Sequence, residues 1–171
     1  MTSIDRGILF LHGRESGPHG SKYRTLVNHF GTVESPDFRG LDLKGRIDKA
    51  EKITRGKENQ ILIGSSMGGL LAALLYSNFP ERFFGYLLLA PAFHWEETSQ
   101  IDKAPPYATI IHGVEDEIAP IEASREFSSK WGTSLIEVQD GHRLKNHHIL
   151  MTLEAKSIEQ KRIEMLKGVH V

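Results

Sequence analysis

Short apolar runs alternate with amphipathic segments along the whole chain. Six runs have the length of strands, and four of these are almost continuously apolar. Continuous apolar strands are typical of a sheet that is covered on both faces. The six runs are residues 8–11, 33–36, 61–63, 86–89, 107–111 and 135–138.

Between the runs, apolar residues recur at the three- and four-residue spacing of helices, around 23–30, 70–75, 121–131 and 144–167. In the last of these helices, Ile149, Leu150 and Leu153 are expected to face the core. Strand–helix alternation predicts an α/β domain with a mostly parallel sheet of about six strands. Ligands of such folds bind at the carboxyl ends of the strands, so catalytic or binding residues are expected just after those ends.

Composition narrows the class of protein. The 171 residues suit one domain, predicted to span 1–171. The net charge of -1 disfavours nucleic acid as a partner, and the absence of cysteine excludes disulfides, thiolate metal sites and a cysteine nucleophile. No apolar run has the length of a membrane span, and the N-terminus does not resemble a signal peptide. We expect no membrane partner and a cytoplasmic location.

The strongest chemical signal is the segment Gly-Ser-Ser-Met-Gly-Gly at 64–69. It has the G-x-S-x-G pattern of a nucleophile elbow, between a predicted strand and a predicted helix. A sharp turn exposes the middle serine, and side chains two positions to either side would collide across it. Ser66 is therefore the candidate nucleophile. The alternative is a Gly/Ser turn that merely begins a helix.

A serine nucleophile needs a base and an acid that orients the base. Asp116 follows a buried strand and could be the acid. Glu115 and Glu117 flank it, so the acid could be one position away, and a helix-capping carboxylate in a surface loop is an equally good interpretation.

His142 lies just after the last predicted strand, in a glycine-containing turn, and is the candidate base. The three candidates follow the ends of three strands in the order Ser, Asp, His. This is the chain order of α/β-hydrolases and differs from that of chymotrypsin and subtilisin.

Two backbone amides could form an oxyanion hole. Met67 begins the helix after Ser66, and Arg14 lies in a glycine-bearing loop after the first strand. No role is expected for the His12 and Arg14 side chains. The basic stretch from Lys44 to Lys57, which includes Arg46, is interpreted as a solvated helix face.

These motifs together resemble the α/β-hydrolase superfamily. The matching residues are His12-Gly13, the segment 64–69, His112-Gly113 with Asp116 and Pro120, and Gly141-His142. Within the superfamily the chain is similar to small, cap-less bacterial esterases of the YqiA type. The segment 64–69 is also similar to mitochondrial acyl-protein thioesterases of the abhydrolase-10 kind.

The resemblance implies a minimal α/β-hydrolase fold: a three-layer α/β/α sandwich with parallel strands in the order 2-1-3-4-5-6. Cap domains of the superfamily usually follow the strand that here ends at Ala90. Only residues 91–106 separate that strand from the next one, which leaves room for a short lid but not for a cap domain.

The expected function is that of a serine hydrolase acting on a small acyl ester or thioester, without a cofactor or metal. A non-catalytic protein that binds a small ligand or a partner on this scaffold is one alternative. An aminopeptidase-like hydrolase is another, and it would need acidic residues such as Glu15, Glu96 or Glu97 to hold a substrate amine. Oligomeric state is left open.

Overall fold

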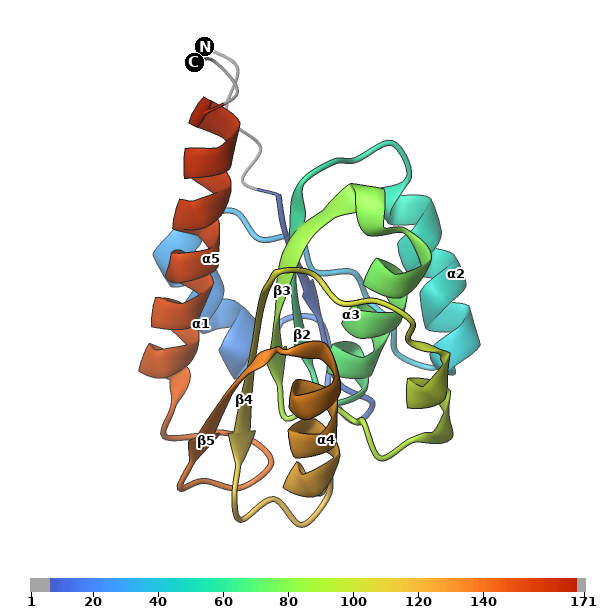
Figure 1. The fold of residues 1–171 in the computed structure, drawn as a ribbon, viewed down its shortest axis with the longest axis vertical. Coiled ribbons are helices and arrows are strands. Elements are labelled where there is room, and N and C mark those ends of the chain that lie inside the picture. Colours follow the sequence, from blue (N-terminus) through green and yellow to red (C-terminus); the bar gives the residue numbers. More distant parts are fainter. Residues whose placement is uncertain (1–6, 169–171) are drawn as a thin grey trace.

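A five-stranded parallel sheet forms the centre of the computed structural model, which describes residues 7–168. Its strands lie side by side in chain order and all run parallel. They are β1 (Ile8–Leu11), β2 (Gln60–Ser65), β3 (Phe83–Leu89), β4 (Tyr107–Gly113) and β5 (Ser134–Val138). The carboxyl ends of the strands therefore share one edge, at the bottom of Figure 1.

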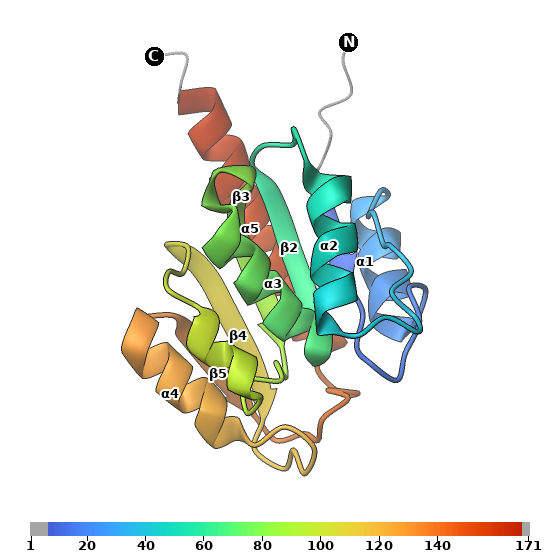
Figure 2. The ribbon, with the colours of Figure 1, turned by 90° about the vertical axis from the view of Figure 1, so that its right-hand side faces the viewer.

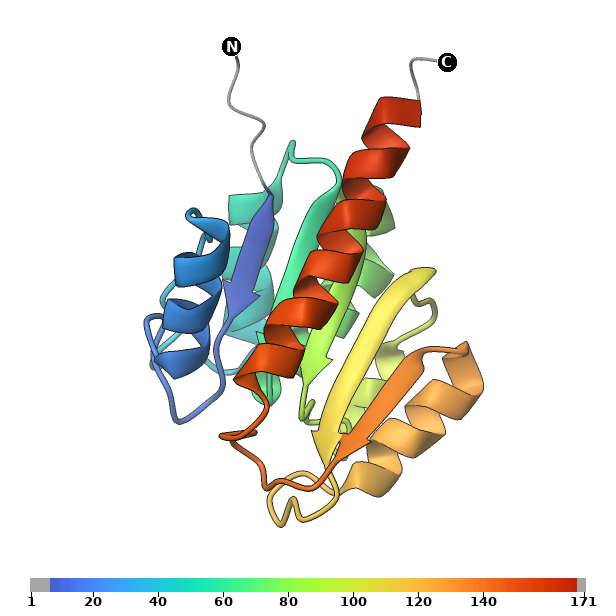
Figure 3. The same ribbon diagram turned by 90° about the vertical axis from the view of Figure 1, so that its left-hand side faces the viewer.

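Helices cover both faces of the sheet, as expected for a three-layer fold. On one face lie α2 (Leu43–Thr54), α3 (Met67–Asn78) and α4 (Ile121–Trp131), seen in front in Figure 2. The other face carries α1 (Ser21–Phe30) and α5 (His148–Gly168), seen in front in Figure 3.

Each face of the sheet has its own hydrophobic core. Leu9 and Leu11 of β1 pack into the core beneath α3, whereas Ile8 and Phe10 pack into the core beneath α5. Successive side chains of a strand point to opposite faces, so a sheet covered on both sides needs apolar residues at every position. The continuous apolar runs are explained by this arrangement.

The sheet has five strands, not the six that the apolar runs predicted. The predicted second strand, 33–36, lies beside β1 as expected but forms only a single bridge there, between Glu34 and Leu9. Glu34 donates to the Ile8 carbonyl and accepts from the Phe10 amide. The next donor of a parallel ladder would be residue 36, which is Pro36 and has no N–H, so the pairing stops.

The last helix shows the core a different face from the one predicted. The helix begins at His148, and Ile149 and Leu153 are 80% and 57% exposed. Met151, Ala155 and Ile158 are buried instead, and of the three predicted residues only Leu150, which is half-buried, packs against the core. Apolar residues occur on more than one side of this helix, so spacing alone did not fix which side contacts the sheet.

The segment 91–106 contains a short 3-10 helix, η2 (Glu96–Gln100). It is fastened to α3 by Ser77, whose hydroxyl donates to Asp102 Oδ1 at 2.7 Å and accepts from the Asp102 amide at 2.9 Å. Phe93 stacks on Phe127 of α4, with 4.2 Å between the ring centroids. The segment 91–106 is thus held against both α3 and α4.

None of the helices within residues 7–168 is both long and apolar enough to cross a membrane. The ends of the predicted domain, residues 1–6 and 169–171, lie outside the described residues.

Candidate active site

Ser66 occupies a strained turn between β2 and α3. Its φ and ψ are 56° and -117°, a positive-φ backbone conformation that residues other than glycine rarely adopt. The glycines around it are sterically required: a Cβ on Gly64 would lie 2.2 Å from the Gly68 carbonyl oxygen, and one on Gly68 would lie 2.0 Å from the Leu11 carbonyl oxygen. The sequence pattern at 64–69 therefore has the geometry of a nucleophile elbow.

Neighbouring strands fix this turn from outside. The Ser66 amide donates to the Leu89 carbonyl at 2.9 Å, and the Ser66 carbonyl accepts from the Ala92 amide at 3.0 Å. Ala90, between these two partners, also has a positive φ, of 44°. Hydrogen bonds to the end of β3 and to the loop after it thus help to keep Ser66 in its strained conformation.

We expect Gly68→Ala to destabilise the protein strongly. The new Cβ would meet main-chain oxygens of Leu11 and His12, at 2.0 and 2.8 Å, and main chain cannot move aside as a flexible side chain can. The free energy of unfolding should fall by about 3 kcal/mol or more, at the upper end for overpacked cores. Gly20→Ala is the matched control, because a Cβ there meets nothing within 4 Å. Equal urea midpoints for the two variants would contradict this account.

His142 lies between Ser66 and Asp116. Its Nε2 is 3.0 Å from Ser66 Oγ, and its Nδ1 is 2.8 Å from Asp116 Oδ2. A carboxylate only accepts, so Nδ1 carries the hydrogen and Nε2 is free to accept the serine proton. The three residues come from the ends of β2, β4 and β5, which the parallel sheet brings to one edge.

Asp116 is the acid that reaches His142, and its side chain is fully buried. Burial by itself would raise its pKa, but hydrogen bonds from His112 and His142 and from the amides of Ala119 and Ile118 outweigh that effect. The pKa is therefore held well below its usual value, and the carboxylate is ionised at neutral pH. Glu115 and Glu117, the alternative acids, are exposed.

A second histidine contacts the same carboxylate. His112, fully buried on β4, places Nε2 3.0 Å from Asp116 Oδ2 and 2.8 Å from the Ala119 carbonyl oxygen. Both partners are acceptors, so Nε2 carries the hydrogen, and Nδ1 accepts from the Ser124 hydroxyl at 2.8 Å. The sequence pattern indicates no separate role for His112, because the fold alone brings its partners together.

The two residues predicted to donate to an oxyanion, Met67 and Arg14, lie at the start of α3 and in the loop after β1. Met67 is the first residue of α3, where the helix itself supplies no acceptor for the amide. Gly13, which precedes Arg14, packs on the elbow: a Cβ there would lie 3.5 Å from Ser66 Cβ. The Arg14 side chain is 70% exposed and pairs loosely with Glu15.

A cleft of about 720 Å³ is bordered by Arg14 and Met67. Apolar side chains and charges of both signs share its surface. Its lining consists of Arg14, Glu15, Gly40, Leu41, Asp42, Leu43, Lys44, Arg46, Met67, Trp95 and Glu97. The predicted lid segment thus forms one wall, through Trp95 and Glu97.

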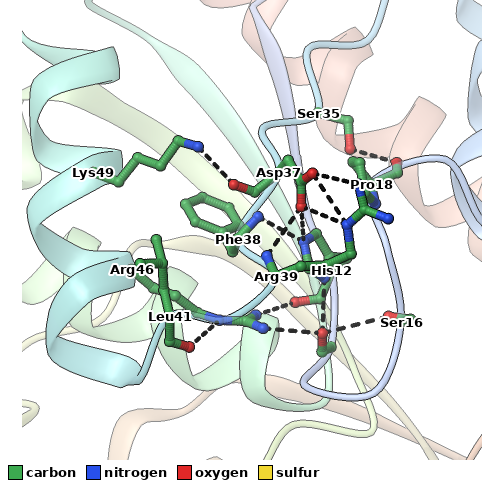
Figure 4. A network of polar contacts seen from close by, with 11 residues as sticks. His12, Ser16, Pro18, Ser35, Asp37, Phe38, Arg39, Leu41, Arg46 and Lys49 are labelled. Carbon is green, nitrogen blue, oxygen red and sulfur yellow. Dashed lines mark hydrogen bonds and ion pairs between the residues drawn. The ribbon is translucent and has the colours of Figure 1, made fainter.

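Arg46 does not belong to a solvated helix face, as the sequence suggested. It is 1% exposed, and its guanidinium donates to the carbonyl oxygens of His12 and Gly13, at 2.7 and 3.2 Å (Figure 4). The signal was present in the spacing: Leu43, Arg46 and Ala50 follow each other at helical intervals on the buried side of α2. The charges around Arg46 concealed that spacing.

No three His, Asp or Glu side chains within residues 7–168 are grouped so that they could hold a metal ion. At the carboxyl edge of the sheet, the serine, the imidazole and the carboxylate described above form a chain of hydrogen bonds.

Residues 12–109 match the family described as serine aminopeptidase, S33, a family of hydrolases. This match covers more than half of the chain. The protein belongs to the serine aminopeptidase S33 family. The match includes Ser66 and ends before Asp116 and His142, so the contacts of the latter two residues come from the structure and not from the family match.

Several solved structures share the fold of this S33 family member. Mouse alpha/beta hydrolase domain-containing protein 10 is 18% identical, with a TM-score of 0.74. The superposition covers 94% of this chain and 92% of the mouse chain. A hydrolase of the alpha/beta superfamily from Xanthomonas campestris pv. campestris is 24% identical, with a TM-score of 0.70 and coverages of 94% and 98%. The monoacylglycerol lipase of Paleococcus ferrophilus is 15% identical, with a TM-score of 0.67 and coverages of 92% and 93%.

No curated protein sequence matches the chain. The structural similarities establish the α/β-hydrolase fold, and membership of the S33 family makes the protein a hydrolase of the α/β superfamily.

Proposed function

We propose that this S33 family member is a serine hydrolase of small carboxylic esters or thioesters, with Ser66, His142 and Asp116 as its catalytic triad. The observation that carries the proposal is the position of His142, hydrogen-bonded to Ser66 Oγ at 3.0 Å and to a buried, ionised Asp116 at 2.8 Å. A strained serine at a helix start supports the same conclusion.

The reaction would begin when His142 Nε2 takes the Ser66 proton and Oγ attacks the acyl carbonyl carbon. The negative charge on the carbonyl oxygen would be held by the amides of Met67 and Arg14. Collapse of this intermediate breaks the bond to the alcohol or thiol, which leaves with the proton from His142. Water then gives a proton to His142 and attacks the acyl carbon, and His142 returns that proton to Ser66 Oγ as the bond between Oγ and the acyl carbon breaks and the acid leaves.

Aminopeptidase-like activity is the second candidate, favoured by the description of the matching family and by one observation of the structure. Glu15 and Glu97, both considered for a substrate amine, line the cleft. Arg14 and Lys44 line it too, so its acidic charge is offset. The ester hypothesis requires no amine subsite and is therefore preferred. It agrees with the activity in the name of the monoacylglycerol lipase, which shares the fold.

A substrate panel tests the proposal. It contains p-nitrophenyl esters from acetyl to dodecanoyl, the matching N-acetylcysteamine thioesters, and aminoacyl p-nitroanilides. We expect turnover of the esters or thioesters, and higher kcat/KM for short acyl groups, because the cleft has charged as well as apolar walls. Turnover of the anilides alone would favour the aminopeptidase. Inactivity toward all three classes would contradict a hydrolase of small acyl compounds.

A further inference from the structure

The carbonyl oxygen of the peptide bond between Gly13 and Arg14 accepts from three donors. The Gly13 carbonyl oxygen accepts from Arg46 at 3.2 Å, from His12 Nδ1 at 2.8 Å and, more weakly, from Ser16 Oγ at 3.4 Å (Figure 4). Arg46 also donates to the preceding carbonyl, that of His12, at 2.7 Å. Two successive carbonyls of the loop are thus turned toward α2.

The direction of a carbonyl determines the direction of the next amide. The described chain contains no cis peptide bond, and in a trans peptide the C=O and the following N–H point in opposite directions. With the Gly13 oxygen drawn toward Arg46, the Arg14 N–H points away from Arg46. If this peptide rotated, the negative end of the carbonyl dipole would point where the Arg14 N–H now points.

The guanidinium itself is firmly placed. Its Nε donates to the Leu41 carbonyl at 3.4 Å, and its Cζ lies 5.6 Å from the centre of the Phe38 ring. All three hydrogen-bond acceptors found for Arg46 in residues 7–168 are main-chain carbonyls. Burial lowers its pKa, but a guanidinium remains charged in proteins. A planar fork of donors suits two adjacent carbonyls better than an ammonium would.

His12 supports the same peptide from its own ring. Its Nε2 accepts from the Phe38 amide at 2.9 Å, so the hydrogen is on Nδ1, which donates to the Gly13 carbonyl. Phe38 is fully buried, and it therefore gives both His12 and Arg46 a fixed surface.

We propose that Arg46 is a positioning residue for the oxyanion hole. It holds the carbonyls of His12 and Gly13 on the side of α2 and so presents the Arg14 amide, with a buried positive charge behind it, to the oxyanion that forms on attack by Ser66. This role rests on the proposed serine hydrolase function.

The test compares Arg46→Met with a matched variant elsewhere in the molecule, Arg82→Met. Arg82 is also largely buried, donates to a main-chain carbonyl, that of Glu51, at 3.0 Å, and lies 4.2 Å from the centre of the Phe79 ring. Both variants should lose stability. Only Arg46→Met should lose kcat, by about 10- to 100-fold, less than the 100- to 1,000-fold typical of removing an oxyanion donor outright.

Two further readouts separate positioning from a general loss of structure. KM should change little, and the inhibition constant of a trifluoromethyl ketone, whose adduct carries the oxyanion, should rise by the same factor as kcat/KM falls. Arg46→Lys keeps the charge but places its donors on a single nitrogen, and it should recover part of the lost rate. It also serves as the test variant if Arg46→Met does not fold.

The outcomes are distinguishable. A wild-type protein without turnover and without labelling by a fluorophosphonate would refute the triad and the role of Arg46 together. An active wild type with unchanged kcat in Arg46→Met, or with equal losses of kcat in Arg46→Met and Arg82→Met, would refute only the role of Arg46.

Discussion

Replacing Ser66 by alanine should reduce ester or thioester hydrolysis by roughly 10⁶-fold in kcat, the loss seen when a triad serine is removed from a hydrolase. The reason is that Ser66 Oγ is the group 3.0 Å from His142 Nε2 and is the atom proposed to attack the acyl carbon. Without it no acyl-enzyme forms. The measurement is kcat for the best ester of the substrate panel, together with the mass of the intact protein after treatment with a fluorophosphonate.

The chain supplies its own control, because Ser65 directly precedes Ser66. Ser65→Ala should keep near wild-type turnover and take up one fluorophosphonate, whereas Ser66→Ala should take up none. A Ser66→Ala protein that hydrolyses esters like the wild type would overturn the mechanism. Failure of the wild type to react with the fluorophosphonate would favour a binding protein on a hydrolase scaffold, since labelling requires an activated serine.

Asp116→Asn should lower kcat by about 10⁴-fold, as loss of the triad carboxylate does in serine proteases. Asp116 Oδ1 accepts from the amides of Ile118 and Ala119, so the amide oxygen of an asparagine would occupy that position. Its NH₂ group would then face His142 Nδ1 and act as a donor. This would move the imidazole hydrogen to Nε2, where it points at Ser66 and blocks proton transfer.

The neighbouring acids provide the comparison. Glu115→Gln and Glu117→Gln, at exposed positions, should leave kcat close to wild type. If either lowered kcat as much as Asp116→Asn, or if Asp116→Asn kept most activity, the acid would be assigned to the wrong residue.

Asp116→Asn should also change how the stability of the fold depends on pH. The folded-state pKa of Asp116 lies below its ordinary value, so the ionised group stabilises the fold at neutral pH, and this contribution fades as the pH falls through the acidic range. The wild type should therefore lose more stability on acidification than Asp116→Asn.

Much of the fold and of the candidate site could be predicted because local patterns report on it directly. Continuous apolar runs follow from a sheet covered on both faces, and parallel strands bring their carboxyl ends to one edge. Residues that follow strand ends, such as Ser66, Asp116 and His142, are therefore neighbours in space although they are 26 to 76 positions apart. The glycines around Ser66 were informative because the turn excludes any side chain there.

Other features depended on contacts that no local pattern records. Pro36 limited the second predicted strand, 33–36, to a single bridge, and packing on the sheet selected which side of α5 is buried. Arg46 is a charged residue in a charged segment, and only the approach of α2 to the loop after β1 shows that two carbonyls need its guanidinium. The sequence by itself determined the kind of fold and which residues follow the strands. The tertiary structure decided how buried polar groups are satisfied, because their partners lie on segments far apart in the chain.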